Sequence, residues 1–249
     1  KKAPSIVPKT DDDGAGYVTA SGSHFGQYID MEGTAAKDNV ALIKKYRGIA
    51  EHPEVDAAIE DIINESVVSS ELEASVSINL DQVDAPDRIK KTITEEFDNI
   101  YGLLNFEEHG HDMFRSWYVD GRIFHHLVVN ESNMKAGIQD IRPIDATKIR
   151  KVKEVEYKKD PKTGAKVVDK TKEFFIYQEK SGMNQGVKLT PDSVSYVTSG
   201  LTDSSKRRVV SYLQKAIKPV NQLRMMEDSL VIYRMSRAPE RRIFYIDVG

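Results

Sequence analysis

A long helical pattern near the end of the sequence, Arg207 to Ala238, constrains this chain more than any other feature. At about 100° per residue, its first half has one apolar face, as an ordinary amphipathic helix does. That face holds Val209, Val210, Leu213, Ala216, Ile217 and Val220. A strand-like segment, Arg241 to Val248, follows the pattern.

Beyond Pro219 the pattern is apolar around most of its circumference. The face that was apolar now carries Arg224, Glu227 and Asp228. The remaining directions hold the large apolar residues Leu223, Met225, Met226, Leu230, Ile232 and Tyr233. A helix that is apolar nearly all round must be covered by other protein. We therefore expect neighbouring copies of the chain to flank it.

Pro219 predicts a kink or a hinge between the two halves. A proline inside a helix removes one backbone donor and clashes with the carbonyl four residues earlier, which costs about 3 kcal/mol. The alternative is that the helix breaks at this point, which would give two short helices.

The same region concentrates positive charge. From residue 206 to residue 242, ten basic residues stand against three acidic ones, which gives this segment a net charge of +7. Because the whole chain carries −3, the remainder carries −10.

The composition excludes several classes of protein. The chain has no cysteine, which rules out disulfide frameworks, thiolate metal sites and cysteine nucleophiles. It has no apolar run near the length of a membrane span and no secretory signal pattern. Because the sequence starts at Lys1 and stops at Gly249, directly after a predicted strand, we expect it to be the ordered part of a longer polypeptide.

The rest of the sequence predicts an α+β fold. Residues 1–37 are rich in proline, glycine and aspartate and predict an arm that is extended or disordered. Apolar periodicity predicts helices over 38–50 with Asp38 as N-cap, after Pro53, over 87–104 and over 111–120. Apolar runs predict strands over 75–80, 122–129, 152–157, 173–178, 187–189 and 193–197, of which the third and fourth form a hairpin.

Two groups of residues suggest metal sites, and neither matches a closed motif. His109, His111, His125 and His126 accompany Asp112, but adjacent histidines on a strand point to opposite faces. A solvated helix face explains the second group better than metal binding does: Glu54, Asp56, Glu60, Asp61 and Glu65. There is no P-loop, dinucleotide-binding fingerprint or serine nucleophile elbow. We predict no catalytic residue, no metal site and no cofactor.

The basic segment suggests two hypotheses in which the chain itself binds DNA. One is a metal-dependent DNA nuclease that uses His109, His111 and Asp112 beside a basic DNA-binding helix. The other is a small DNA-binding regulator, which we disfavour because the helix carries too many large apolar residues to lie exposed on a groove.

Blocks spread over residues 38 to 249 carry a resemblance to a known family. They are Tyr46-Arg47, Pro53-Glu54-Val55-Asp56, Ala58-Ile59-Glu60-Asp61-Ile62, Arg115-Ser116-Trp117-Tyr118-Val119-Asp120-Gly121-Arg122-Ile123-Phe124, Ile144-Asp145, Ile149-Arg150, Ser211-Tyr212-Leu213, Ala216-Ile217-Lys218-Pro219, Asn221-Gln222-Leu223, Glu227-Asp228, Val231-Ile232-Tyr233-Arg234, Arg237-Ala238-Pro239, Arg241-Arg242 and Tyr245. On these blocks the chain resembles the portal vertex proteins of tailed bacteriophages, of the T-even-like, contractile-tailed kind.

The resemblance implies a ring of twelve subunits at one vertex of the capsid. Such a ring conducts double-stranded DNA during packaging and ejection, and it initiates head assembly. Its implied partners are the major capsid protein, the scaffold, the terminase large subunit and later the neck protein. The resemblance places the protein in the virion, and in the host cytoplasm during assembly.

Carried onto this sequence, the portal fold divides the chain into four parts. Residues 1–37 would be an N-terminal arm, 38–205 the α-helical and β wing domain, 206–239 the first, kinked stem helix and 240–249 the first strand of the clip. The rest of the clip, the returning stem helix, the tunnel loop and the crown would lie beyond Gly249.

The stem segment supplies the candidate site residues. For the subunit interface we expect Leu223, Arg224, Met226, Glu227, Asp228, Leu230, Tyr233 and Arg234, with Pro219 as the hinge. For the DNA channel or a charge network we expect Lys215, Lys218, Arg237, Arg241 and Arg242. Twelve bare +7 segments would grip DNA too strongly for a conduit, so most of these cations should be neutralised by acids. Arg224 can pair with Glu227 at i,i+3 or with Asp228 at i,i+4. ATP hydrolysis should belong to a partner.

Overall fold

The computed structural model describes residues 13–19, 34–68, 75–130, 132–133, 136–159, 166–179, 186–203, 208–238 and 244–249. Its helices are α1 (Thr34–Ala50), α2 (Pro53–Ser66), α3 (Asp87–Leu104), α4 (Phe106–Asp120) and α5 (Ile217–Arg237), with the short 3-10 helices η2 (Pro191–Ser193) and η3 (Tyr212–Lys215). Its strands are β1 (Gly16–Thr19), β2 (Arg122–Val129), β3 (Ile138–Ile144), β4 (Ile149–Lys159), β5 (Lys166–Tyr177), β6 (Val187–Leu189) and β7 (Val194–Thr198).

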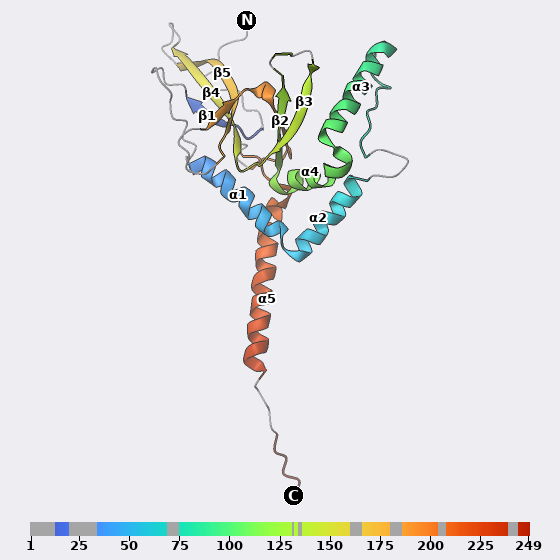
Figure 1. The fold of residues 1–249 in the computed structure, drawn as a ribbon. Coiled ribbons are helices and arrows are strands. Elements are labelled where there is room, and N and C mark those ends of the chain that lie inside the picture. The colour runs from blue at the N-terminus through green and yellow to red at the C-terminus, as the bar shows by residue number, and fades with distance from the viewer. Residues whose placement is uncertain are drawn as a thin grey trace.

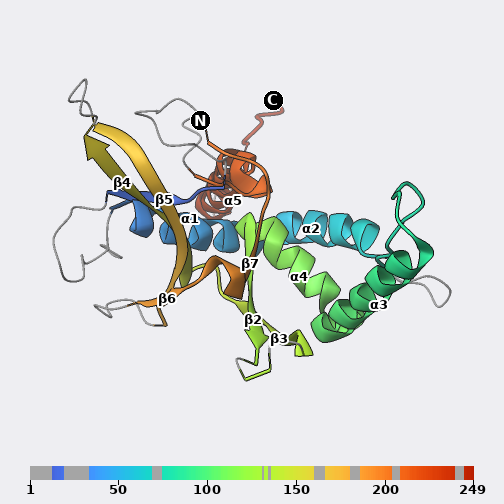
Figure 2. The same cartoon turned by 90° about the horizontal axis from the view of Figure 1, so that it is seen from above.

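The fold is a mixed α and β body from which α5 projects alone (Figure 1). This confirms the predicted combination of helices and strands. One sheet has the strand order β1-β4-β5-β6 and the other the order β3-β2-β7. Seen from above, the long β4–β5 hairpin and the β2–β3 hairpin lie on different sides of the body, and α3 and α4 lie beyond β2 (Figure 2).

Helix α1 joins two hydrophobic cores. Toward the sheets, Ile43 of α1 packs in a cluster with Phe124, Ala146, Ile149, Phe175 and Val194. Toward the other helices, Tyr46 and Ala50 of α1 pack in a cluster with Ile59, Ile63, Val119 and Leu213. These positions recur three and four residues apart along α1, which is why one short helix can serve both cores.

Most predicted elements are confirmed, with shifted ends, and two local predictions are wrong. The helices after Pro53 and over 87–104, the strand over 122–129 and the β4–β5 hairpin are present. Residues 75–80 form no strand and leave Val76 42% exposed, because their alternation meets no partner strand within the described part of the chain. Asp38 is not an N-cap, since α1 already begins at Thr34. The predicted turn over 160–164 lies outside the described residues.

Part of the predicted arm is incorporated into the body. Strand β1 pairs in parallel with β4, and Asp13 just before it meets two lysines of β4. Asp13 Oδ2 lies 2.7 Å from Lys151 Nζ and 3.2 Å from Lys153 Nζ, and Glu173 of β5 also contacts both lysines. Lys153 is only 1% exposed, so these carboxylates compensate a buried cation.

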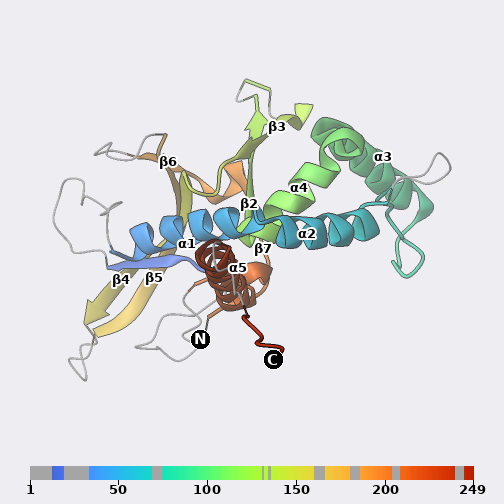
Figure 3. The ribbon, with the colours of Figure 1, turned by 90° about the horizontal axis from the view of Figure 1, so that it is seen from below.

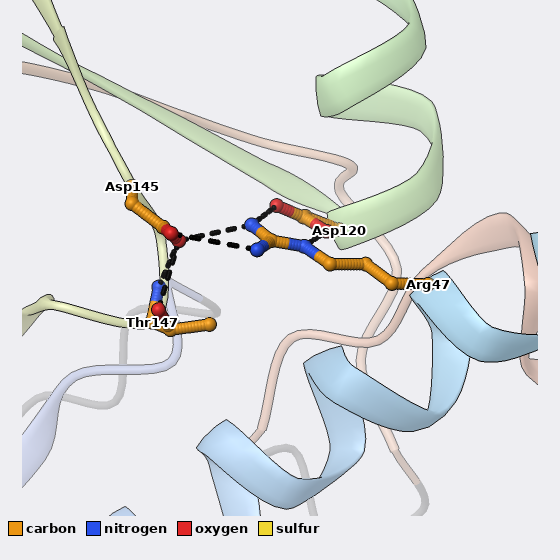
Figure 4. Close-up of polar contacts among 4 residues, drawn as sticks. All are labelled: Arg47, Asp120, Asp145 and Thr147. Atoms are coloured by element: carbon orange, nitrogen blue, oxygen red, sulfur yellow. Dashed lines mark hydrogen bonds and ion pairs between the residues drawn. The ribbon is translucent and has the colours of Figure 1, made fainter.

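A second polar network ties α1 to the ends of α4 and β3 (Figure 4). Arg47 Nε and Nη2 donate to the two oxygens of Asp120 at 2.9 and 2.6 Å, and Nη2 also donates to Asp145 Oδ1 at 2.9 Å. Thr147 donates from its backbone and its hydroxyl to the same oxygen of Asp145. The hydrogen bond with Asp120 raises the pKa of Arg47. This network fixes the angle between α1 and the β-sheet layer.

Removal of Arg47 should destabilise the fold more than removal of an exposed arginine. Arg47→Ala leaves the Asp120 carboxylate, 6% exposed, without its partner, and should lower the free energy of unfolding by about 2 kcal/mol. Arg142→Ala is the matched control, because its pair with Asp140 is exposed, and it should leave the urea midpoint unchanged. Equal midpoints for the two variants would contradict this assignment.

The Asp13 cluster predicts a loss of stability in acid. Burial alone would raise the pKa of Asp13, but hydrogen bonds from Lys151 and the Ala15 backbone outweigh it and hold the pKa below its ordinary 3.8. A lowered folded pKa means stabilisation that is complete above the ordinary value and is lost as pH falls through the folded value. Urea midpoints measured from pH 7 to pH 2.5 should therefore fall less steeply below pH 4 for Asp13→Asn than for the native chain. Asp192→Asn, an exposed acid outside the cluster, should retain the native slope.

Candidate functional site

The base of α5 is fixed to the helical body by η3. Ser211 Oγ donates to Tyr118 O at 2.9 Å and accepts from Leu213 N at 3.0 Å. Leu213 is buried in the core between α1, α2 and α4. The ring of Tyr212 stacks on that of Tyr118, with centroids 5.0 Å apart. The base is therefore anchored by a cap, a buried side chain and an aromatic stack.

The turn from α4 into β2 passes very close to this base. Gly121 ends α4 with a φ of 72°, a conformation that favours glycine. A Cβ at this position would lie 2.9 Å from the backbone of Ser211. The next residue, Arg122, is buried and donates from Nη2 to Val209 O at 2.6 Å. Glycine is required here because the two backbones touch.

The prediction of a helix that starts at Arg207 is wrong for the first half of that segment. Val209 forms an isolated bridge with Thr202, Ser211 is extended, and α5 begins only at Ile217. Val209, Val210 and Leu213 are buried by the body. Their spacing therefore reflects burial of an irregular segment. Arg207 itself lies outside the described residues.

Pro219 produces no kink, and that prediction is wrong too. It is the third residue of α5, within the first turn, where backbone N–H groups have no intrahelical acceptor. Proline at this place loses no hydrogen bond of the helix. A hinge between the body and α5 remains a prediction.

Most of α5 is exposed on every side. Val220 packs on the body and Leu223 is half-buried, but from Arg224 onward every side chain to Ala238 is exposed. Among the predicted interface residues, Met226 is 64% exposed, Leu230 53% and Tyr233 52%. The structure adds Met225, Val231, Ile232 and Met235, each more than half exposed. Val231 and Met235 were not predicted as interface residues, although both belong to the apolar part of the helical pattern in the sequence.

Within the described part of the chain, few charges of α5 have a partner of opposite sign. Among the described residues, Arg224 and Asp228 form no ion pair, so the expected i,i+3 and i,i+4 pairs are absent. Glu227 Oε2 lies 3.9 Å from His52 Nε2 at the α1–α2 corner. The Arg237 guanidinium lies over the Tyr233 ring, 4.5 Å from its centroid. Lys215, Lys218 and Arg234 are exposed.

The segment after α5 is only partly described. Residues 244–249 form no strand, so the predicted strand from Arg241 to Val248 is not present in that part. Phe244 and Tyr245 are 82% and 92% exposed. Arg241 and Arg242 lie outside the described residues.

The residues considered for a metal site and for the nuclease alternative do not form a metal centre within the described part of the chain. His109, Asp112 and His125 line a crevice of about 720 Å³ between α3, α4 and the β2–β3 hairpin. His111 instead lies 3.2 Å from Glu60. Within the described part of the chain, no three His, Asp or Glu side chains are arranged to hold a metal ion. The nuclease alternative is therefore not supported.

The acids of α2 have another role. Arg115 of α4 donates to Asp56 and to Glu60, so two of these acids link α2 to α4. They belong neither to a metal site nor to a purely solvated face.

No helix in the described ranges is both long and apolar enough to cross a bilayer.

An anchored body with a projecting, exposed apolar helix is typical of a subunit of a larger assembly. Comparison with known proteins identifies the family of the chain. Residues 39–249 match the family described as Bacteriophage T4-like portal protein (Gp20). The portal protein of Vibrio phage KVP40 is 40% identical over 221 residues, which cover 84% of this chain and 42% of the relative. The portal protein of Salmonella phage ViI is 30% identical over 262 residues, which cover 98% of this chain and 46% of the relative.

The chain belongs to the T4-like portal protein family. This confirms the resemblance drawn from the sequence blocks. The chain spans less than half the length of the two relatives.

Truncation at the base should destabilise the folded chain, whereas truncation on α5 should leave its stability nearly unchanged. Leu213→Ala removes a buried side chain and should lower the free energy of unfolding by about 2–5 kcal/mol. Leu230→Ala removes an exposed one and should change it by less than about 0.5 kcal/mol. Chemical denaturation of the 249-residue chain measures both. A large loss for Leu230→Ala alone would mean that α5 packs on its own body.

Proposed function

We propose that this chain forms the wing and the first stem helix of a portal subunit. Twelve copies would close into a ring at the capsid vertex and conduct double-stranded DNA during packaging and ejection. The observation that carries the proposal is α5: a portal-family helix with apolar residues on most of its circumference and little cover from its own body. Neighbouring copies provide that cover.

The geometry of α5 suits a head-to-tail ring. Two different faces of one helix carry large apolar side chains, so the surface that one copy offers differs from the surface it receives. Contacts of this heterologous kind generate closed rings when the rotation between copies closes. The cap at Ser211 and the buried Leu213 hold α5 at a fixed angle to the body, which lets the same rotation repeat.

The charges support a conduit that does not hold DNA. Cations that face a duplex release counterions and tighten binding, so a working channel requires most of them to be paired or turned away. Since Arg224 and Asp228 have no ion-pair partner among the described residues, acids and bases of adjacent copies are the natural partners. Arg234 and the predicted residues Lys215, Arg237, Arg241 and Arg242 would join them, whereas Lys218 at the base of α5 would remain a channel residue.

The body and the segment after α5 would bind different partners. The body, as the wing, would contact the major capsid protein and the scaffold, and through them initiate head assembly. The segment beyond α5 would lead into the clip, which binds the terminase large subunit and later the neck protein. ATP hydrolysis would belong to that motor. The site of action is the virion vertex, reached from the host cytoplasm during assembly.

The experiment that tests the proposal is electron microscopy of the purified full-length protein. The native protein should show rings with twelve-fold symmetry. Leu230→Lys places a charge on the apolar surface of α5 and should reduce rings to a small fraction of particles. Val187→Lys, the same change at a similarly exposed apolar residue of β6, is the matched control and should leave rings intact.

Two outcomes would overturn the proposal. One is a native protein that remains monomeric at micromolar concentration. The other is a Leu230→Lys variant that forms rings as abundantly as Val187→Lys does.

A further inference from the structure

Most of the large exposed apolar side chains of α5 form two separate faces. At 100° per residue, Leu223, Met226, Leu230 and Tyr233 lie within about 80° of one another on the first face. Met225 and Ile232 lie within about 20° of each other on a second face, and the centres of the two faces are about 130° apart. The sectors between them differ in width and in chemistry.

The narrow sector is polar and almost uncharged. It contains Lys218, Gln222, Ser229 and Ser236, which lie at intervals of four and seven residues and are all exposed. The wide sector contains the charged side chains of the mid-helix, Arg224, Glu227, Asp228 and Arg234, together with Val220, Val231 and Met235. A helix with two lateral partners therefore has one neutral side and one charged side.

Ring closure selects which side faces the axis. In a ring of twelve, the directions from one copy to its two neighbours enclose about 150° on the side of the axis and about 210° on the outside. If the two apolar faces meet the two neighbours, the narrow sector must face the axis. This step rests on the proposed function.

The position of the body leads to the same orientation independently. Val220 is buried against the body, and Glu227 lies 3.9 Å from His52 at the α1–α2 corner, so the body lies on the side of the wide sector. Seen from below, α1 and α2 pass along one side of α5, with α3, α4, β2 and β3 beyond them (Figure 3). A body of this size cannot fill an open channel, so its side of α5 faces outward.

The chemistry of the narrow sector suits a surface along which DNA slides. Phosphate oxygens bind hydrogen-bond donors and cations. Ser229 Oγ already donates to Met225 O at 2.6 Å, and Ser236 Oγ to Tyr233 O at 3.0 Å. Their hydroxyl protons are therefore committed to the backbone of the helix. Only the Gln222 amide and the Lys218 ammonium at the base retain donors.

We propose that Lys218, Gln222, Ser229 and Ser236 form the axis-facing stripe of α5, turned toward the sugar-phosphate backbone of the passing duplex. Each copy then presents one cation to the DNA, Lys218 at the base of α5. The rest of the stripe consists of neutral side chains with few hydrogen-bond donors. The charged residues of the wide sector face away from DNA. The stripe lowers the affinity of the channel wall for phosphate, so that DNA moves without being held.

Site-directed photocrosslinking to DNA tests this orientation. Single cysteines are placed in a cysteine-free background of the full-length protein at Ser229→Cys and, as the matched neutral control, at Val231→Cys, about 200° away around the helix. Both are labelled with an aryl azide in heads stalled during packaging. We expect at least tenfold more DNA adduct from position 229. Gln222→Cys repeats the test if the first variant fails to assemble.

Each result decides the orientation. Adducts that are equal at the two positions, or that favour position 231, overturn the stripe while the ring and the proposed function stand. Failure of the parent protein to form rings would instead overturn the proposed function. The two failures are therefore distinguishable.

A second measurement uses charge. Ser229→Lys should steepen the dependence of log Kobs for duplex binding to assembled rings on log salt, by about 0.9 for each added cation that meets a phosphate. Glu227→Gln changes the charge by the same amount on the wide sector and should leave the slope unchanged. A steeper slope for Glu227→Gln than for Ser229→Lys would overturn the stripe.

Discussion

The apolar surface of α5 is the constraint on which the rest of the structure depends. Burying one large apolar side chain is worth about 1.5–3 kcal/mol, and this helix exposes at least six of them. A chain that left them in water would aggregate or associate without order. Controlled association requires a helix held at a fixed angle, and the anchored base of α5 serves that requirement.

In the body, the two hydrophobic cores meet at helix α1, next to the base of α5. Helix α1 contributes to both cores, and the base of α5 is buried in the second of them through Leu213. Arg47 on the same helix links Asp120 at the end of α4 to Asp145 after β3. The element that orients α5 is therefore also the element that ties the helices to the sheets. A change in α1 would therefore alter the direction in which α5 leaves the body.

The regular helices and strands could be predicted from the sequence. Segments that are buried without forming a regular helix or strand could not. Periodicity located α2, α3 and β2 because their apolar residues follow one repeat from end to end. It failed at Val209 and Val210, whose burial comes from a bridge and a buried arginine rather than from a helix face. It failed at Pro219 because the start of α5 could not be known without η3. Most apolar residues of the site were predictable, since α5 is regular beyond its base, but Val231 and Met235 were missed. The ion pairs expected for Arg224 with Glu227 or Asp228 are absent from the described residues.

The central claim is that assembly buries α5 between copies, and methionine oxidation measures it most directly. Met226 is 64% exposed in the single chain, whereas Met113 of α4 is half-buried and serves as an internal reference. Peroxide oxidation followed by mass spectrometry compares assembled rings with dissociated subunits of the full-length protein. The account predicts that Met226 oxidises at least tenfold more slowly in the ring, with Met113 unchanged. Equal rates for Met226 in the two states would contradict it.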